Sequence, residues 1–218
     1  MTIGPGDSQQ LWEAFGDRQP TWAARQETPA AARPLANDRC QWLTEPIEDC
    51  LTRRRSVRHF EAAAVPRSQI LGAIEAARAA EEAVWPRDRH GGLRLDFLLA
   101  AFDVTGLGQG IYATGRTGTE LLSEDLGYLD VLREQYLAAP ALLLLCADLN
   151  QACRDAGPAG YPAALTRAGT AGYAAWLWSI SAGLAGCLLG GASRYASAAA
   201  RLKNQNLRHL FTVAIGLP

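Results

Sequence analysis

The sequence predicts an α+β or mixed three-layer domain preceded by an N-terminal extension. Segments whose apolar residues recur at helical spacing alternate with a few short, strongly apolar runs that are typical of buried strands. At 218 residues, the chain is long enough for one domain that buries roughly 70% of its surface. No internal repeat or low-complexity block suggests a different architecture.

Residues 1–44 are expected to form an extension or arm, and residues 45–218 the folded domain. The arm is rich in Pro, Ala, Arg and Gln, has poor periodicity, and carries Trp12, Trp22 and Trp42. A disordered tail is the alternative, but disordered segments are usually poor in aromatic residues. We therefore expect the tryptophans to anchor the arm on the domain.

Apolar spacing gives the elements of the domain in chain order. Ile70, Leu71 and Ile74 repeat at helical spacing after a Pro-containing start, whereas residues 141–148 are apolar up to the final Asp148, as in a buried strand. Breakers between 85 and 92 predict a loop. The expected helices are 45–51, 65–82, 119–122, 129–137, 165–184 and 196–203, and the expected strands are 93–104, 111–114, 141–148 and 209–215.

Residues 168–193 carry no charged residue and are long enough to be considered as a membrane span. The run contains six glycines and several Ser and Thr residues, which fit a span poorly. A core helix from 165 to 184 followed by a glycine-rich loop explains it better. We expect no membrane association.

Composition excludes several classes of function. All basic residues but Lys203 are arginine, and no long basic face suggests binding to nucleic acid. The five cysteines are odd in number and never spaced C-x-x-C, so they read as buried thiols of a reducing compartment. None of the three histidines stands at metal-ligand spacing from a cysteine or carboxylate. Without a secretion signal at the N-terminus, the expected location is cytoplasmic.

The segment 53–60, Arg-Arg-Arg-Ser-Val-Arg-His-Phe, places four guanidinium groups and the Ser56 hydroxyl close together. Arginine stays charged at any relevant pH, and its planar fork matches phosphate oxygens. The segment therefore predicts a site for a phosphate monoester, with a solvated basic turn as the alternative.

Residues 106–110, Gly-Leu-Gly-Gln-Gly, follow a predicted strand and invite comparison with a dinucleotide-binding loop. The third glycine comes one place too early, and residues 111–114 read as another strand where that motif requires a helix. A hairpin turn is the expected role.

Four motifs resemble, in order and spacing, those of the nitroreductase superfamily, and in particular its SagB-type thiazoline/oxazoline dehydrogenases, which oxidise azolines in peptide natural products. The match extends over residues 53–218. The motifs are Arg54-Arg55-Ser56-Val57-Arg58; Arg89-His90-Gly91-Gly92-Leu93 with Gly110-Ile111-Tyr112; Ala139-Pro140-Ala141 with Ala168-Gly169; and Gly183-Leu184-Ala185-Gly186-Cys187 with Gly190-Gly191, ahead of Ile215-Gly216-Leu217-Pro218.

The resemblance implies a nitroreductase-like fold with a central, mostly antiparallel sheet flanked by helices, and a domain-entwined homodimer with flavin mononucleotide (FMN) at its interface. The predicted helix 165–184 supports a dimer because Tyr173, Trp176 and Trp178 give it more apolar surface than one small domain readily covers. The implied FMN-binding residues are Arg54, Arg55, Ser56, Arg58, Arg89, Gly91, Gly92, Leu189, Gly190 and Gly191.

The catalytic residues of the resembled family are not matched. Its active members carry a Lys-Tyr pair before the central helix, where this chain has Asp155-Ala156. Tyr161 and Asp155 are the candidate catalytic residues, with exposed loop residues as the alternative for both.

The expected activity is FMN-dependent oxidation of a peptide-derived azoline, or of a related C–N or C–C bond, in the biosynthesis of a ribosomally made peptide natural product. A cyclodehydratase or another modifying enzyme would then be a partner. Two alternatives remain: a catalytically degenerate scaffold or regulatory subunit of a peptide-modifying enzyme, and an NAD(P)H-dependent flavin reductase of small electrophiles.

Overall fold

The computed structural model describes residues 43–86, 93–116, 118–127, 129, 138–190 and 194–218, which belong to one compact unit, Gln41–Pro218. The expected arm, the loop 87–92 and the expected helix 129–137, apart from its first residue, lie outside the described residues. In the described part, helices alternate with strands, as expected.

Six strands form one sheet in which every hydrogen-bonded pair of neighbours is antiparallel. The mostly antiparallel sheet is therefore confirmed. Its central strand β6 is continuously buried, because both faces of the sheet are covered. The strand order is β5 (Thr119–Ser123), β4 (Gly110–Thr114), β2 (Leu95–Ala101), β6 (Ala141–Asp148), β8 (Leu207–Gly216) and β7 (Ala185–Gly190), and a separate parallel pair joins β1 (Val65–Pro66) to β3 (Val104–Thr105).

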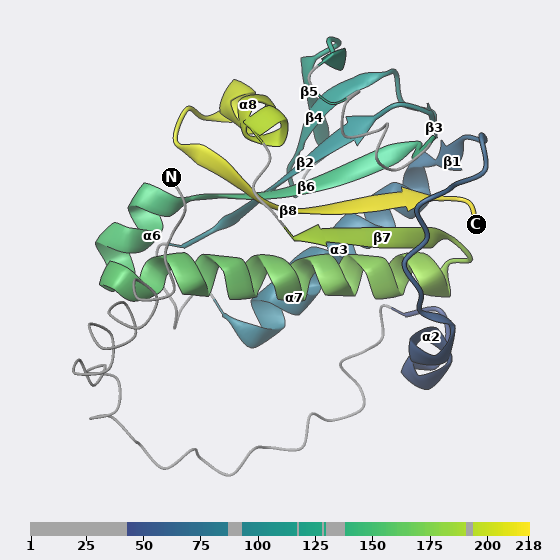
Figure 1. Ribbon diagram of the computed structural model, residues 1–218, viewed down its shortest axis with the longest axis horizontal. Helices are drawn as coiled ribbons and strands as arrows, with labels where there is room; N and C mark the ends of the chain where they lie inside the picture. Colours follow the sequence, from purple (N-terminus) through teal and green to yellow (C-terminus); the bar gives the residue numbers. More distant parts are fainter. Residues whose placement is uncertain (1–42, 87–92, 117, 128, 130–137, 191–193) are drawn as a thin grey trace, which may run out of the picture. The chain divides into compact units, whose positions relative to one another are not determined.

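Helices cover both faces of the sheet and complete the three layers (Figure 1). Alternate residues of β6 point to opposite faces: Leu143 and Leu145 pack with α3 and α7, whereas Leu142 and Leu144 pack with α8. The α+β class is confirmed. The helices are α2 (Ile47–Arg53), α3 (Arg67–Val84), α6 (Leu149–Ala156), α7 (Gly160–Ser181) and α8 (Arg194–Lys203), and a 3₁₀ turn (Gly157–Ala159) precedes α7.

Three predictions about elements were wrong. Residues 119–122 form strand β5, because Leu121 pairs with Tyr112 across the neighbouring strand. The predicted helix 165–184 starts earlier and ends earlier, as α7. The predicted glycine-rich loop after it is strand β7, which pairs with β8 along its whole length. Hydrophobic spacing could not show these pairings, which depend on tertiary contacts.

Helix α7 ends at Ser181, and Gly183, two residues later, has a φ of +79°, the left-handed conformation that glycine tolerates best. The N–H of Gly183 donates to the carbonyl of Ile180, and the N–H of Leu184 donates to that of Ser179. This Schellman arrangement satisfies carbonyls at the helix end and turns the chain directly into β7. Among the helices that the structure describes, none is long and apolar enough to cross a membrane.

Candidate functional site

The arginine segment 53–58 meets the start of β7 within one chain. Ser56 and Gly186 form a parallel bridge, and the Val57 N–H donates to the Gly186 carbonyl at 3.0 Å. The resemblance implies that the arginines and the glycine-containing stretch after the central helix belong to one FMN site. The two segments are in contact at Gly186. A small cavity of about 180 Å³ lies at this junction, and its lining includes Arg53, Arg55, Val57, Gly183 and Gly186.

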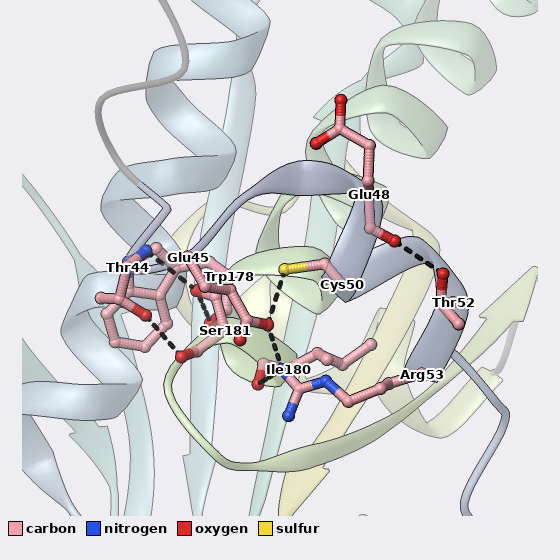
Figure 2. Close-up of polar contacts among 9 residues, drawn as sticks. All are labelled: Thr44, Glu45, Glu48, Cys50, Thr52, Arg53, Trp178, Ile180 and Ser181. Carbon is pink, nitrogen blue, oxygen red and sulfur yellow. Dashed lines mark hydrogen bonds and ion pairs between the residues drawn. The ribbon is translucent and has the colours of Figure 1, made fainter.

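A polar latch, formed by Thr44, Glu45, Cys50 and Arg53, holds this segment against the end of α7 (Figure 2). The Glu45 carboxylate accepts hydrogen bonds from the Cys50 thiol, at 3.0 Å, and from the Arg53 guanidinium. Arg53 also donates to the carbonyl of Ile180, and the Thr44 hydroxyl donates to that of Ser181. These contacts hold α2 and the residues before it against the end of α7. They also fix the position of Arg53, which directly precedes Arg54.

The latch also sets two pKa values. The thiol of Cys50 is fully buried, and burial, aided by the Glu45 charge, raises its pKa to about 11. The hydrogen bond from Cys50 and the contact with Arg53 lower the pKa of Glu45. Glu45 therefore stays ionised beside Arg53. Segment 53–60 was expected to offer four guanidinium groups to an anion. Arg53 is paired with Glu45, so three of the four are left for that role.

The three remaining arginines are free to bind a ligand. Arg54, Arg55 and Arg58 are exposed, and none has a hydrogen-bond or ion-pair partner among the described residues. The guanidinium of Arg54 lies over two rings of α7, 5.0 Å from the centroid of Trp176 and 5.7 Å from that of Tyr173. Ser56, also exposed, adds a neutral donor to these three cations.

Strand β7 forms one edge of the sheet, and the arginine segment covers only its beginning. The Gly186 carbonyl points away from β8, toward Val57, so the backbone groups of Leu188 and Gly190 point the same way by the two-residue period of a strand. Leu189 instead directs its backbone groups to β8. Of the predicted FMN-binding residues on this strand, Leu189 therefore turns its N–H away from the outer side of β7, whereas Gly190, like Leu188, turns its N–H toward it.

The other predicted FMN-binding residues, Arg89, Gly91, Gly92 and Gly191, lie outside the described residues. The chain leaves α3 for the first three of them at Trp85, whose ring lies under the guanidinium of Arg167, 5.6 Å away. Arg167 also forms a buried ion pair with Glu81. Arg167 precedes Ile180 by thirteen positions on α7, which is about 20 Å along a helix. Trp85, where the chain leaves α3, thus lies far from the arginine segment of its own chain.

The candidate catalytic residues are also distant from the arginine segment within one chain. Tyr161 lies exposed in the first turn of α7, about 28 Å from Ile180 along the helix axis. Asp155 lies exposed on α6 and accepts a hydrogen bond from Gln151 at 2.6 Å. Asp155 and Tyr161 both lie on helices, whereas no helix was predicted over residues 149–159.

Two further expectations need correction. Cys50, Cys146 and Cys187 are buried as predicted, but Cys153 is exposed. On α7, Trp176 is only 3% exposed, and Trp178 packs against Gly72 of α3. The apolar surface of this helix is therefore largely covered within one chain, and it no longer supports a dimer. Among the described residues, no group of three or more His, Cys, Asp or Glu side chains could hold a metal.

The chain is similar to known proteins in structure but not in sequence. No protein-family model matches the chain, and no curated protein matches it in sequence. Its structure is similar to that of an Anabaena variabilis protein classed as a nitroreductase, with a TM-score of 0.65, 17% identity, and coverage of 79% of this chain and 38% of that one. A Ralstonia eutropha protein classed in the same way gives 0.59 at 18% identity, with coverage of 79% and 83%.

The NADPH:FMN oxidoreductase of Vibrio harveyi, complexed with NAD⁺, matches with a TM-score of 0.51 at 18% identity, covering 79% of this chain and 68% of that one. The match therefore spans well under half of the Anabaena protein but most of the other two. Since all three likenesses extend over the same share of this chain, the described part of the chain adopts the nitroreductase fold.

Proposed function

We propose that this protein is an FMN-dependent oxidoreductase. The observation that supports it best is the position of Arg54, Arg55 and Arg58, which have no hydrogen-bond or ion-pair partner among the described residues, beside strand β7 at the edge of the sheet. A phosphate monoester is a dianion at neutral pH, and three guanidinium groups would balance it with charge to spare. The Vibrio harveyi protein of this fold is an FMN oxidoreductase by its name, which adds to the proposal.

Residues of this chain fit both the phosphate end and the flavin-ring end of FMN. The three arginines and Ser56 would hold the phosphate, and the outward N–H groups of Leu188 and Gly190 would serve as donors to the flavin ring. Gly190 has no side chain to keep a planar ring from the backbone. When bound, FMN supplies a two-electron acceptor that no side chain of the protein can replace.

A homodimer follows as part of the proposal. Within one chain, the arginine segment and the start of the loop that carries Arg89, Gly91 and Gly92 lie near opposite ends of the α3–α7 pair, about 20 Å apart. A two-fold axis that sets one end against the other would complete two equal sites. The same pairing is the way for Tyr161 or Asp155 to approach β7.

As substrate we propose a peptide-derived azoline or a related C–N or C–C bond, with a cyclodehydratase as the enzyme that supplies it. A second candidate is a scaffold or regulatory partner of such an enzyme. The position of Asp155-Ala156, where active relatives of the resembled branch carry Lys-Tyr, favours this candidate, because neither residue lies near β7 in its own chain.

Reconstitution with FMN tests the proposal. The purified protein should hold about one FMN per chain and show flavin absorbance, and R54A/R55A should lose most of it because the phosphate loses two of its three cations. R201A, a change of an exposed arginine on α8, is the matched control and should remain yellow. A wild-type protein that stays colourless after reconstitution contradicts the proposal.

Turnover assays then separate the candidate activities. Oxidation of an azoline peptide by the yellow protein alone supports the dehydrogenase and excludes the inactive scaffold. Fast bleaching of the bound flavin by NADPH supports a flavin reductase instead. A yellow protein that is inert in both assays, but that changes the rate of a partner cyclodehydratase, supports the scaffold.

A further inference from the structure

Arg54 is held in a way that leaves its hydrogen-bonding edge open. Its guanidinium carbon lies within cation–π distance of the rings of Trp176 and Tyr173. The N–H groups of a guanidinium lie in its plane and point outward from it. Since none of them has a partner in the part of the chain that the structure describes, they remain available to an anion.

The two rings form a firm platform. Tyr173 and Trp176 stand one turn apart on α7 and contact each other edge to face, with centroids 6.1 Å apart and an interplanar angle of 80°. Trp176 is wedged against β7: a Cβ on Gly186 would lie 2.6 Å from its Cδ1. Trp176 therefore has little freedom to move, and it offers the guanidinium of Arg54 a ring in a fixed position.

The indole at position 176 carries a cost that a purely structural ring would avoid. Its Nε1–H is buried and has no hydrogen-bond partner among the described residues. Burying an unpaired donor lowers stability, and phenylalanine would fill much of the same space without it. Tryptophan, however, gives the strongest cation–π contact. The choice of residue favours the contact with Arg54 over the stability of the core.

We infer that Tyr173 and Trp176 are positioning residues that hold Arg54 for the phosphate of the cofactor, and so make the site select FMN over riboflavin, which lacks that phosphate. The inference rests on the proposed function, and it assigns the selectivity to an aromatic platform on α7 in addition to the arginines. The platform acts through Arg54 and does not touch the reacting atoms.

Binding of FMN and of riboflavin to the full-length apoprotein, measured by flavin fluorescence and calorimetry, tests this inference. W176L should weaken FMN by up to about fivefold and leave riboflavin unchanged, because an exposed cation–π contact is worth roughly a two- to fivefold change in affinity. W176F should weaken FMN two- to threefold and also leave riboflavin unchanged, because a phenyl ring gives a weaker cation–π contact than an indole. A role limited to folding cannot weaken the binding of one flavin and leave that of the other unchanged.

Two controls complete the experiment. W178F changes a tryptophan of the same helix that packs against α3 and not against Arg54, and it should leave the ratio of the two affinities unchanged. R54A should lower the ratio, and adding W176L to R54A should lower it no further. Equal weakening of both ligands by W176F and W176L overturns the inference alone. A wild-type protein that does not prefer FMN to riboflavin overturns the proposed function, and this inference with it.

Discussion

His209 should make the stability of the fold depend on pH. It is 1% exposed on β8, where its ring Nε2 lies 2.7 Å from the Thr212 hydroxyl. Its backbone N–H donates to the Ser197 hydroxyl of α8. Burial lowers its pKa from 6.5 to about 4, although a hydrogen bond to the backbone of Phe211 opposes this. Its cross-strand neighbour is the buried Cys146, whose pKa is raised by burial, so the thiol stays neutral.

The sign follows from proton binding. Between pH 6.5 and 4 the unfolded chain takes up a proton on His209 and the folded chain does not, so stability is complete above pH 6.5 and falls as the pH falls. The difference between the folded and unfolded pKa values lowers the free energy of unfolding by about 3 kcal/mol once His209 is protonated in both states. About 2 kcal/mol of this is lost between pH 7.5 and pH 5.

Urea unfolding at pH 7.5 and pH 5 measures this effect. The wild-type protein should lose about 2 kcal/mol more of its unfolding free energy over this range than H209N does, because asparagine does not titrate. H59N, a change of an exposed histidine in the arginine segment, should behave as wild type. If H209N and wild type lose the same free energy, the assignment of a buried neutral His209 is wrong, whatever the stability of H209N at pH 7.5.

Two further predictions concern α7 and the latch. G169A should raise the free energy of unfolding by up to about 1 kcal/mol, because its Cβ meets open space in a helix, whereas G172A should lower it, because its Cβ would lie 2.7 Å from the Phe211 ring; urea unfolding that moves both the same way contradicts the packing described for α7. E45Q should lower the pKa of Cys50 and cost little stability, since the Arg53 pair is half exposed; an NMR titration of ¹³C-labelled Cys50, with E48Q as control, checks it, and an unchanged pKa rules out the contact with Glu45.

The sequence could predict those parts of the fold that a repeating apolar pattern determines. The buried strand β6 was found because all its residues except the last, Asp148, are apolar, and α3 because its apolar residues recur at helical spacing. Strands β5 and β7 were missed because both are edge strands, with exposed ends or glycines, and only their pairing partners define them.

The candidate site divides in the same way. The sequence showed the arginines and the glycines, because those residue types are chemically distinctive in a short stretch. It could not show that Glu45 pairs with Arg53, or that Trp176 lies under Arg54, because both contacts require the chain to fold back on itself. Tyr173 and Trp176 were instead read as a dimer surface. An aromatic residue on an apolar helix gives no sequence signal for the cation that it contacts.

The position of the site at the end of α7 explains why so many arginines are needed there. Many phosphate sites lie at the N-terminus of a helix, where the backbone supplies N–H donors and positive charge. Here the arginine segment packs on the C-terminal end of α7, whose last carbonyls carry roughly half a negative charge, and the Glu45 carboxylate adds a full negative charge. Arg53 binds both Glu45 and the carbonyl of Ile180, and so offsets this negative charge. An anion at this end of the helix would then have to be held by side chains, and Arg54, Arg55 and Arg58 are the three that remain for it.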